Sequence, residues 1–442
     1  MIRRTFLRLL LALTPLLGQA QAQDNVRPLT ILHSNDLHAH LRPDDMDRGG
    51  FARLATEVRQ QKANCAACLY LNAGDMVQGT PVSTYFHGSP VYEIANGLGL
   101  DVSTLGNHEF DYGSTRVQEF AKIAHYPVLS ANVVDAKGAS ITGKPYVIKT
   151  VGGIRVAIIG VVLGDLVNLT SADSVAPFHV LPVVETVRKY AKELRDQSDI
   201  IIALGHIHDE QEVKAILQQV PEVSVVVAGH THVAYPQMMN VDGRVAVLVN
   251  NYGTQLGRLD LQVDLSAKKL RSAEWKKIPI DASIAPDPHV AREVAKWEAK
   301  VTKFVDVPIG EASRRIEGKE LRALLEHAIA EETGSDLAFV NEGNIRDVFP
   351  KGQLLARHVW NIFPFENRIV IGKFKGSELP KVIKDRGGID PNREYTFATA
   401  DYTVTNQSLP DELATTGLVF PKIERLERDV VIDWIKKKRI LP

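Results

Sequence analysis

Between residues 29 and 264 the chain alternates short apolar runs, rich in β-branched residues, with longer amphipathic stretches. This alternation is typical of strands that helices cover, so it predicts an α/β layered domain. After the first run, Phe51, Leu54, Ala55 and Val58 share one face of a predicted helix. Strands are predicted at residues 29–32, 69–72, 102–105, 156–162, 200–204, 223–228 and 245–249.

The pattern changes after residue 265. Residues 266–305 are charged and contain three prolines, and a polar helix is predicted over residues 290–304, as in a bridge between domains. The remainder opens with a predicted helix at residues 321–333 and continues in short strands with Gly and Pro turns, which indicates a smaller α+β domain. At 442 residues, two domains are also expected from length alone. The predicted boundaries are 27–270 for the first domain, 271–305 for the linker and 306–442 for the second domain.

Residues 1–22 have the pattern of a secretory signal peptide. Three arginines precede an apolar run at residues 9–17, and a small-x-small site follows at Ala20-Gln21-Ala22. The apolar run is shorter than the roughly 20 residues that a bilayer requires. We therefore expect a periplasmic or secreted protein. The arginine pair resembles a twin-arginine signal, and the sequence leaves this route and general secretion open.

The formal net charge of the chain is -1, and the two signs are interspersed. Such a chain has no long-range field to capture nucleic acid or an anionic membrane, so a small-molecule partner is expected rather than a polymer. After the signal peptide, no apolar run is long enough for membrane insertion. The oligomeric state is left open.

The chain has two cysteines, Cys65 and Cys68, in a C-x-x-C spacing. In an oxidising compartment they are expected to form a local disulfide or to remain as two thiols ahead of a strand. The chain lacks the further ligands that a zinc site of this type needs.

Five polar motifs each follow a predicted strand directly. They are Asn35-Asp36-Leu37-His38, Gly74-Asp75, Gly106-Asn107-His108-Glu109-Phe110-Asp111, Gly205-His206 and Gly229-His230-Thr231-His232. Because ligands collect beyond the carboxyl ends of strands in α/β domains, we expect these motifs to converge. Taken singly, each Asp could be a turn residue and each His a hydrogen-bonded structural group. Together they offer carboxylate, amide and imidazole donors, which suit zinc, manganese or iron.

The ordered motifs D-x-H, GD, GNHE, GH and GHxH resemble those of the calcineurin-like metallophosphoesterases. Their context, from Gly74-Asp75 through Gln78-Gly79-Thr80 and across residues 106–113, resembles the 5'-nucleotidase branch. This resemblance implies a four-layer αββα metallophosphoesterase domain, followed by a linker helix and a smaller α+β substrate-binding domain.

The resemblance also implies two divalent metal ions. Asp36, His38 and His232 would bind one ion, and Asp75 would bridge the pair, because a shared carboxylate offsets the repulsion between two cations. The ligands of the other ion would be Asn107, His206 and His230. His33, His40 and His208 flank the motifs and are expected to support the ligands.

His108 and Asp111 correspond to a catalytic dyad in the family. The resemblance implies that His108 stabilises the transition state or assists the leaving oxygen, while Asp111 orients it. A carboxylate holds the ring of a histidine in one tautomer and stabilises its charged form, so the pairing is chemically reasonable.

In the second domain, residues 341–346 resemble the NGGGIR segment of 5'-nucleotidases, with Glu342 and Asn344 in place of glycines, and residues 364–367 resemble the PF-x-N segment. The resemblance implies substrate contacts from Asn341, Arg346, Phe365 and Arg314. A glycine-rich loop that normally lies near the second stacking aromatic is missing after Tyr402. The sequence therefore does not locate the aromatic residue that would form the second wall of a base-binding site.

The sequence thus predicts an exported hydrolase that cleaves phosphate esters of nucleotides by in-line attack of a metal-activated water. The substrates expected are 5'-nucleotides, 2',3'-cyclic nucleotides or UDP-sugars. Two alternatives stay open: a dimetal thiosulfohydrolase of sulfur oxidation, and an exported binding protein without catalysis.

Overall fold

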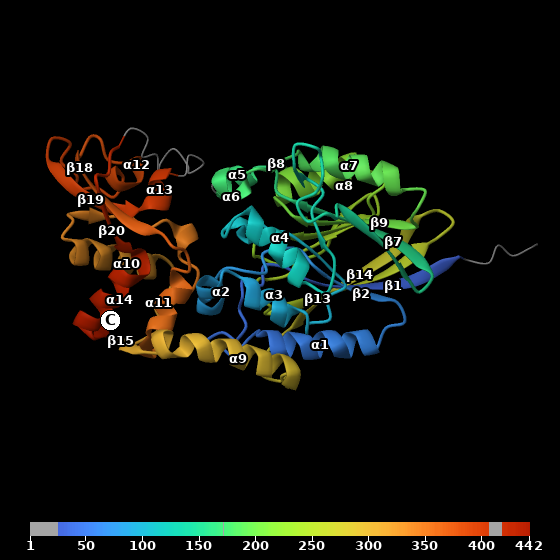
Figure 1. Cartoon of the computed structure of the whole chain (residues 1–442), viewed down its shortest axis with the longest axis horizontal. Helices are drawn as coiled ribbons and strands as arrows, with labels where there is room; N and C mark the ends of the chain where they lie inside the picture. Colours follow the sequence, from blue (N-terminus) through green and yellow to red (C-terminus); the bar gives the residue numbers. More distant parts are fainter. Residues whose placement is uncertain (1–24, 171, 406–417) are drawn as a thin grey trace, which may run out of the picture.

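The computed structural model describes residues 25–170, 172–405 and 418–442, so the predicted signal peptide lies outside the described residues. Figure 1 shows a larger lobe, coloured blue to yellow, and a smaller lobe in orange and red. The long helix α9 (Pro288–Val305) runs along one side and leads from the larger lobe to the smaller one.

The larger lobe contains two six-stranded sheets. The first has the order β14-β13-β1-β2-β3-β4, with β1 at Val26–Ser34, β2 at Cys68–Asn72, β3 at Val102–Thr104, β4 at Val128–Leu129, β13 at Gln255–Asp264 and β14 at Lys269–Pro279. The second has the order β11-β12-β10-β9-β7-β6, with β6 at Tyr146–Val151, β7 at Ile154–Val162, β9 at Ile200–His206, β10 at Val225–Gly229, β11 at Met239–Val241 and β12 at Arg244–Val247.

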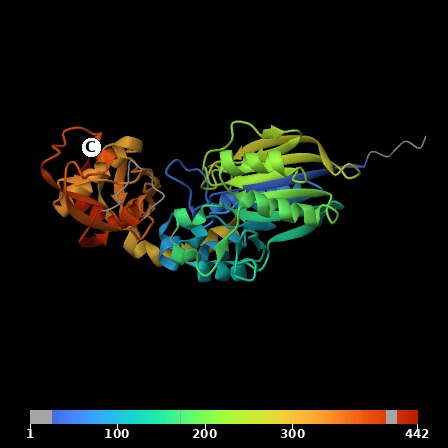
Figure 2. The ribbon, with the colours of Figure 1, turned by 90° about the horizontal axis from the view of Figure 1, so that it is seen from above.

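The two sheets pack face to face, and helices cover their outer faces. In β1, Leu29 and Ile31 join the core between the sheets, whereas Leu32 joins the core under the helices, as the two-residue period of a strand requires. The first sheet is covered by α1 (Phe51–Ala63), α3 (Ser89–Ala95) and α4 (Ser114–Ile123), and the second by α7 (Val183–Leu194) and α8 (Lys214–Gln219). The predicted four-layer αββα fold is confirmed (Figure 2).

The central strands of both sheets are parallel. β1, β2, β3 and β4 form one parallel set, and β7, β9, β10 and β12 form the other. The five polar motifs lie at or just after the carboxyl ends of β1, β2, β3, β9 and β10. They therefore lie at one edge of the two-sheet sandwich, as ligand sites in such sheets do.

The edge strands differ from the sequence expectation. Residues 271–279 were expected in the linker, but they pair along β13 as most of β14. β14 has a charged, largely exposed pattern because it lies at the edge of its sheet and only one side meets the core. Its hydropathy therefore resembles that of a polar linker.

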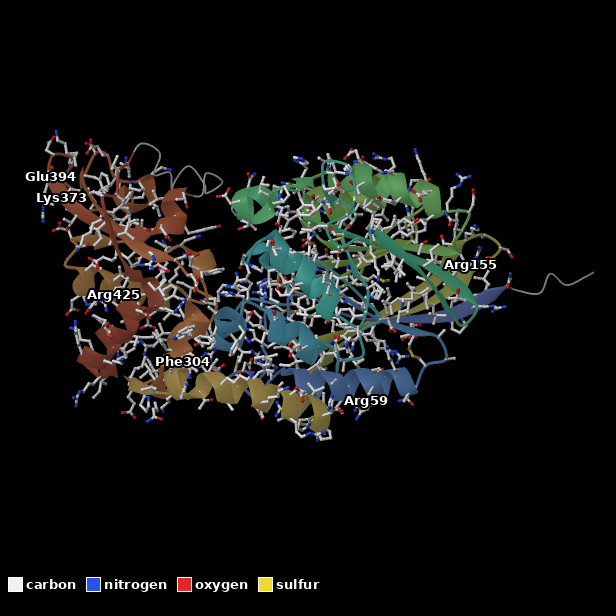
Figure 3. The ribbon with its side chains drawn as sticks, in the orientation of Figure 1. Arg59, Arg155, Phe304, Lys373, Glu394 and Arg425 are labelled. Atoms are coloured by element: carbon white, nitrogen blue, oxygen red, sulfur yellow. A yellow bond between two sulfur atoms is a disulfide. The ribbon has the colours of Figure 1, made fainter. Side chains whose placement is uncertain are left out.

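The start of α9 is fixed to the larger lobe. The carboxylate of Asp287 caps the helix by accepting from the backbone N–H groups of His289 and Val290 at 3.0 and 2.9 Å. Arg59 on α1 forms an ion pair with the same carboxylate, and Figure 3 shows Arg59 beside the start of α9. At its other end, Phe304 of α9 lies against Trp360 of α11 (Ala356–Ile362), with ring centroids 6.1 Å apart.

The smaller lobe combines short sheets with three main helices, so the predicted α+β class is confirmed. One sheet has the order β17-β15-β21, with β15 at Pro308–Ala312, β17 at Gly352–Leu355 and β21 at Ile440–Leu441. The other has the order β16-β19-β18-β20, with β16 at Leu337–Ala338, β18 at Arg368–Lys375, β19 at Glu394–Ala400 and β20 at Lys422–Leu426. Helices α10 (Gly318–Thr333), α11 and α14 (Glu427–Lys438) pack on one another and on these strands.

Two further expectations concern the cysteines and the membrane. Cys65 and Cys68, the first residue of β2, are joined as a disulfide. Among the described residues, no helix combines the length and apolar character that crossing a bilayer demands.

Candidate functional site

Four predicted metal ligands form a tight cluster at the motif edge. Each of Asp36, His38, Asp75 and His232 offers one donor atom, and these atoms all lie within 4.8 Å of one another. The Nε2 atoms of His38 and His232 are 3.0 Å apart, and His38 Nε2 is 3.5 Å from Asp75 Oδ2. The geometry places two imidazole nitrogens and two carboxylates around one point, which suits a divalent cation.

The remaining predicted ligands adjoin this cluster. His206 at the end of β9 lies with its Nε2 3.0 Å from Asp75 Oδ2, and its ring centroid is 5.2 Å from that of His230. Asn107 follows β3 and lines the same cavity as His230. The structure thus brings all seven predicted donors to the carboxyl ends of five strands.

Backbone strain is concentrated at these positions. Five of the seven donors have a positive φ: Asp36 at 50°, His38 at 45°, Asp75 at 51°, His230 at 92° and His232 at 63°. This region of φ is uncommon for residues other than glycine, and such residues cluster at functional sites. The surrounding structure therefore stabilises a backbone path that packing alone would not favour.

Unpaired donor atoms show that the cluster fits a metal. Asn107 Oδ1 is buried without a hydrogen-bond partner among the described residues, and His206 Nε2, although 3.0 Å from Asp75 Oδ2, makes no well-aligned hydrogen bond with them. His206 donates from Nδ1 to the backbone oxygen of Ala73 at 2.8 Å, which leaves its Nε2 lone pair for a metal. Because a buried polar atom without a partner destabilises the fold, a cation that binds these atoms would remove that cost.

The electrostatics of the cluster favour cations. Burial disfavours the charged form of His206, yet the carboxylates of Asp75 and Asp36 raise its pKa to about 10. Burial, together with the charge of His206, lowers the pKa of His230 to about 3. His230 is therefore held as the neutral imidazole, which is the form that binds metals.

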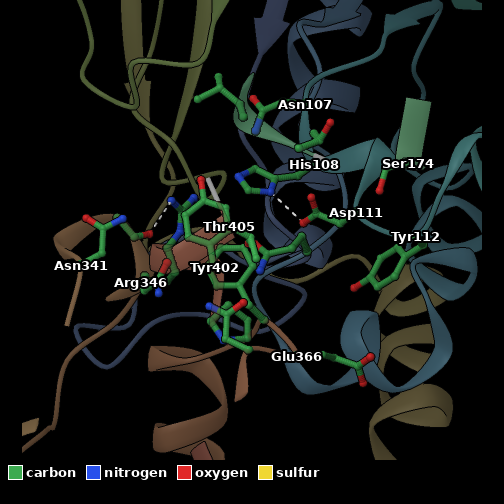
Figure 4. A pocket seen from close by; sticks show the side chains of 18 of the residues that line it. Asn107, His108, Asp111, Tyr112, Ser174, Asn341, Arg346, Glu366, Tyr402 and Thr405 are labelled. Atoms are coloured by element: carbon green, nitrogen blue, oxygen red, sulfur yellow. Dashed lines mark hydrogen bonds and ion pairs between the residues drawn. The ribbon is translucent and has the colours of Figure 1, made fainter. Parts of the chain in front are cut away.

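His108 and Asp111 form the predicted pair beside this cluster. His108 Nδ1 and Asp111 Oδ2 are 2.8 Å apart, and both side chains are mostly buried. Although burial opposes it, Asp111 and Asp75 raise the pKa of His108. The pair can hold a proton on the ring of His108, and both residues line a cavity (Figure 4).

This cavity has a volume of about 830 Å³ and lies between the two lobes. The larger lobe contributes Asn107, His108, Asp111 and His230 to its walls. The smaller lobe contributes its own polar and aromatic residues: Asn341, Asn344, Arg346, Phe365, Glu366, Asn367, Asp401 and Tyr402. Figure 4 shows Arg346 and Tyr402 across the cavity from Asp111. The volume suits a small organic molecule.

Three of the four predicted substrate contacts line the cavity, and one does not. Asn341 and Arg346 lie in its wall, and Arg346 Nη2 is 3.3 Å from His38 Nε2. The ring of Phe365 lies 5.8 Å from that of His108. The assignment of Arg314 is a correction, because Arg314 is outside the cavity lining and its guanidinium is paired with Glu320.

The flanking histidines differ in their surroundings. His208 Nε2 is 2.9 Å from Asp165 Oδ1, and its ring meets that of His230 edge-on at 4.9 Å. His40 stacks on Tyr252 at 3.7 Å. His33 instead accepts a hydrogen bond from Trp275 at 2.9 Å, away from the cavity.

Sequence reasoning missed three residues that support or complete the site. Glu109 accepts hydrogen bonds from the loop of Asp75. Its place inside the motif of residues 106–111 could have indicated this supporting role. Tyr252 packs edge-on against His38 and donates from its hydroxyl to the backbone oxygen of Arg346 at 3.0 Å. Tyr402 supplies an aromatic side chain to the cavity, although the motif that would have marked it is missing from the sequence.

Comparison with known proteins gives two family matches. Residues 29–234 match the calcineurin-like phosphoesterase family, and residues 299–388 match the 5'-nucleotidase C-terminal domain. The two matches cover the donor cluster and much of the smaller lobe, including Asn341, Arg346 and Phe365.

Several characterised proteins are similar to this chain. Endonuclease YhcR of Bacillus subtilis is 28% identical over 87% of this chain, and Protein UshA of Yersinia enterocolitica is 26% identical over 94%. Snake venom 5'-nucleotidase of Naja atra is 34% identical over 64% of this chain. The chain spans 35% of the endonuclease, 90% of UshA and 59% of the venom enzyme.

Two solved structures from Thermus thermophilus share the fold. A 5'-nucleotidase precursor superposes with a TM-score of 0.82 at 22% identity, covering 94% of this chain and 97% of the other. The sulfate thiohydrolase SoxB superposes with a TM-score of 0.81 at 16% identity, covering 93% and 94%. The donor set and the two family matches agree: the chain combines a domain of the calcineurin-like phosphoesterases, a family that uses two divalent metal ions, with a C-terminal domain of the 5'-nucleotidases.

Proposed function

We propose that this protein is an exported phosphohydrolase that uses two divalent metal ions to cleave phosphate esters of nucleotides. One observation carries the proposal: Asn107 and His230 of the donor set and the His108–Asp111 pair share a cavity with Asn341, Arg346 and Phe365 of the other lobe, next to the cluster of Asp36, His38, Asp75 and His232. A substrate in this cavity can reach the donor cluster with its phosphate while the smaller lobe holds the rest of the molecule.

The donors divide into two sets. Asp36, His38 and His232 would bind one ion, and Asp75 would be shared. The second set consists of Asn107, His206 and His230. When bound, the ions would activate a water and stabilise negative charge on the phosphate oxygens.

His108 would act as the proton donor. Hydrolysis adds water across the P–O ester bond and releases an alcohol and phosphate, so the leaving oxygen must gain a proton. Asp111 accepts the hydrogen bond from Nδ1, which leaves Nε2 of the charged ring to donate to that oxygen. Asp111 would stabilise the charged ring and fix its orientation.

Arg346 would bind the phosphate. It is the only arginine or lysine among the described residues that line the cavity. Its distance of 3.3 Å from His38 Nε2 places the guanidinium beside the donor cluster, where a phosphate oxygen would lie. A guanidinium offers paired N–H donors that match two oxygens of one phosphate.

Phe365 and Tyr402 would contact a nucleobase, and Asn341 would hold the sugar or base by hydrogen bonds. The cavity wall of the smaller lobe otherwise carries amides and the carboxylates of Glu366 and Asp401. Aromatic rings offer a stacking surface to any base, and this surface contributes about 1–3 kcal/mol per base. A wall with one arginine, no lysine and several acids does not suit the backbone of a polyanion, so we favour a nucleotide over a nucleic acid strand.

The relatives support this proposal in part. The similarity to a venom 5'-nucleotidase, at 34% identity, supports nucleotide substrates for this chain. The similarity to the sulfate thiohydrolase, at 16% identity, concerns the fold alone. Residues 1–22 favour export, and the Cys65–Cys68 disulfide is in keeping with an oxidising compartment.

Substrate profiling tests the proposal. The protein, purified and loaded with Mn²⁺, is assayed with AMP, 2',3'-cyclic AMP, UDP-glucose, an S-sulfonated cysteine peptide and single-stranded DNA. We expect hydrolysis of the nucleotides; preferential cleavage of the peptide or the DNA would contradict the substrate assignment.

The Asp75→Asn variant tests the metal site in the same assay. We expect it to lose turnover of AMP and of p-nitrophenyl phosphate while it keeps its fold by circular dichroism. Asp242→Asn, at an exposed aspartate outside the cavity, is the matched control and should keep wild-type turnover. Full activity of Asp75→Asn would contradict the two-metal assignment.

A further inference from the structure

Glu109 lies in the loop that follows β3, and its fully buried carboxylate also contacts the loop that follows β2. We propose that Glu109 is a positioning residue, which holds the loop of Asp75 and the loop of Asn107 and His108 in the relative position that metal binding needs. This inference rests on the proposed two-metal site, since it concerns the placement of ligands for those ions.

The carboxylate gathers backbone N–H groups from both loops. Its Oε2 accepts from Gly106 at 2.5 Å and from Asp75 at 3.1 Å, and its Oε1 accepts from Met76 at 2.8 Å. A longer contact of 3.4 Å joins Oε1 to the N–H of Val77. One side chain therefore bonds the backbone of the shared ligand and the backbone of the residue before Asn107.

The two loops are too close for other side chains to intervene. A Cβ on Gly106 would lie 2.1 Å from Asp75 Oδ1, and a Cβ on Gly74 would lie 2.7 Å from the backbone nitrogen of Gly106. The loops are linked again in the opposite direction, because the backbone N–H of His108 donates to Asp75 Oδ1 at 2.9 Å. A shift of either loop would thus move the shared carboxylate relative to Asn107 and His108.

Only a carboxylate of this length satisfies the arrangement. It presents two oxygens with about four lone-pair sites, whereas an amide presents one oxygen and an NH₂ group that would face backbone donors. Asp75 has a φ of 51°, so its loop is held in an unfavourable conformation that needs external support. Partners of this kind, which contact the ligands and not the metal, typically change metal affinity by about 10- to 100-fold when they are substituted.

The test is titration of the metal-free full-length protein with Mn²⁺ by calorimetry, below the melting temperature of each variant. We expect Glu109→Gln to bind Mn²⁺ about 10- to 100-fold more weakly than wild type. Activity of Glu109→Gln should also require correspondingly higher Mn²⁺ and should rise towards the wild-type rate at saturation. A role in fold stability alone would lower the melting temperature but leave the Mn²⁺ affinity of the folded protein unchanged.

Glu57→Gln is the matched control, because Glu57 is a buried carboxylate on α1 that accepts a hydrogen bond from Gln61 outside the cavity. It should bind Mn²⁺ like wild type. If Glu109→Gln does not fold, Glu109→Asp keeps the charge but is too short to reach both loops, and the same weakening is expected. Wild-type affinity in whichever Glu109 variant folds would overturn this inference, whereas failure of the wild type to bind two Mn²⁺ would contradict the proposed function itself.

Discussion

The Asp111→Asn substitution isolates the role of the His108–Asp111 pair. The pair shares one hydrogen bond of 2.8 Å between mostly buried side chains, and the carboxylate is the charged partner. A hydrogen bond to a charged group contributes about 1.5–3 kcal/mol. If this energy is realised only when His108 is charged in the transition state, its loss lowers kcat by about 10- to 150-fold.

The assay compares two esters with different leaving groups. AMP releases an alkoxide that needs a proton, whereas p-nitrophenyl phosphate releases a phenolate that is stable without one. We expect Asp111→Asn to lower kcat for AMP by the full 10- to 150-fold. The decrease in kcat for the nitrophenyl ester should be about tenfold smaller. Metal content, measured by elemental analysis, should equal that of the wild type, because Asp111 is outside the proposed ligand set.

The pH dependence gives a second readout. Asp111 raises the pKa of His108, so its removal lowers that pKa, and the proton donor is then lost at a lower pH. The basic limb of the kcat profile for AMP should move to lower pH in Asp111→Asn. Equal losses with both esters and an unmoved basic limb would refute proton donation by His108.

Three further predictions concern the base-binding wall, the loop contact and the smaller lobe. Phe365→Ala should raise the KM for AMP by roughly 5- to 150-fold, from a stacking contribution of about 1–3 kcal/mol, while the KM for glycerol 2-phosphate stays the same; unchanged KM for AMP would remove Phe365 from the site. Gly106→Ala should abolish Mn²⁺ binding in calorimetry, because its Cβ would lie 2.1 Å from Asp75 Oδ1, and wild-type binding would contradict the contact. Burial raises the pKa of Glu427 to about 8. Between its ordinary pKa and this value the folded protein keeps a proton that the unfolded chain loses, so the stability of the fold falls as the pH rises through that range. Glu427→Gln should therefore melt higher than wild type at pH 9, by roughly 2–4 °C per kcal/mol recovered, whereas a parallel pH dependence of both proteins would contradict a protonated Glu427.

Much of the larger lobe could be predicted from the sequence because its central strands are buried on both faces. Such strands appear as continuous apolar runs, and the polar motifs directly after them locate the edge where ligands gather. The edge strand β14 escaped prediction because its charged pattern resembles that of a linker. Sequence periodicity reflects burial, and β14 is largely exposed.

The donor set was predictable for a similar reason, since seven donors stand in motifs at strand ends. The residues that support them were harder to find. Tyr252 reaches the site through a turn after β12, and its contact with Arg346 joins residues 94 positions apart, which no local pattern records. Arg314 illustrates the opposite error: a cation suited to phosphate is neutralised by Glu320 on the adjoining helix, and only the structure shows that pairing.

Seven side chains are proposed to hold two divalent ions beside His108. A crystal structure of the Mn²⁺-loaded protein, with anomalous scattering measured at the manganese edge, would locate these ions. We expect two anomalous peaks about 3.5–4 Å apart, with Asp75 between them, Asp36, His38 and His232 around one, and Asn107, His206 and His230 around the other. A single peak, or two peaks that Asp75 does not join, would contradict the two-metal proposal.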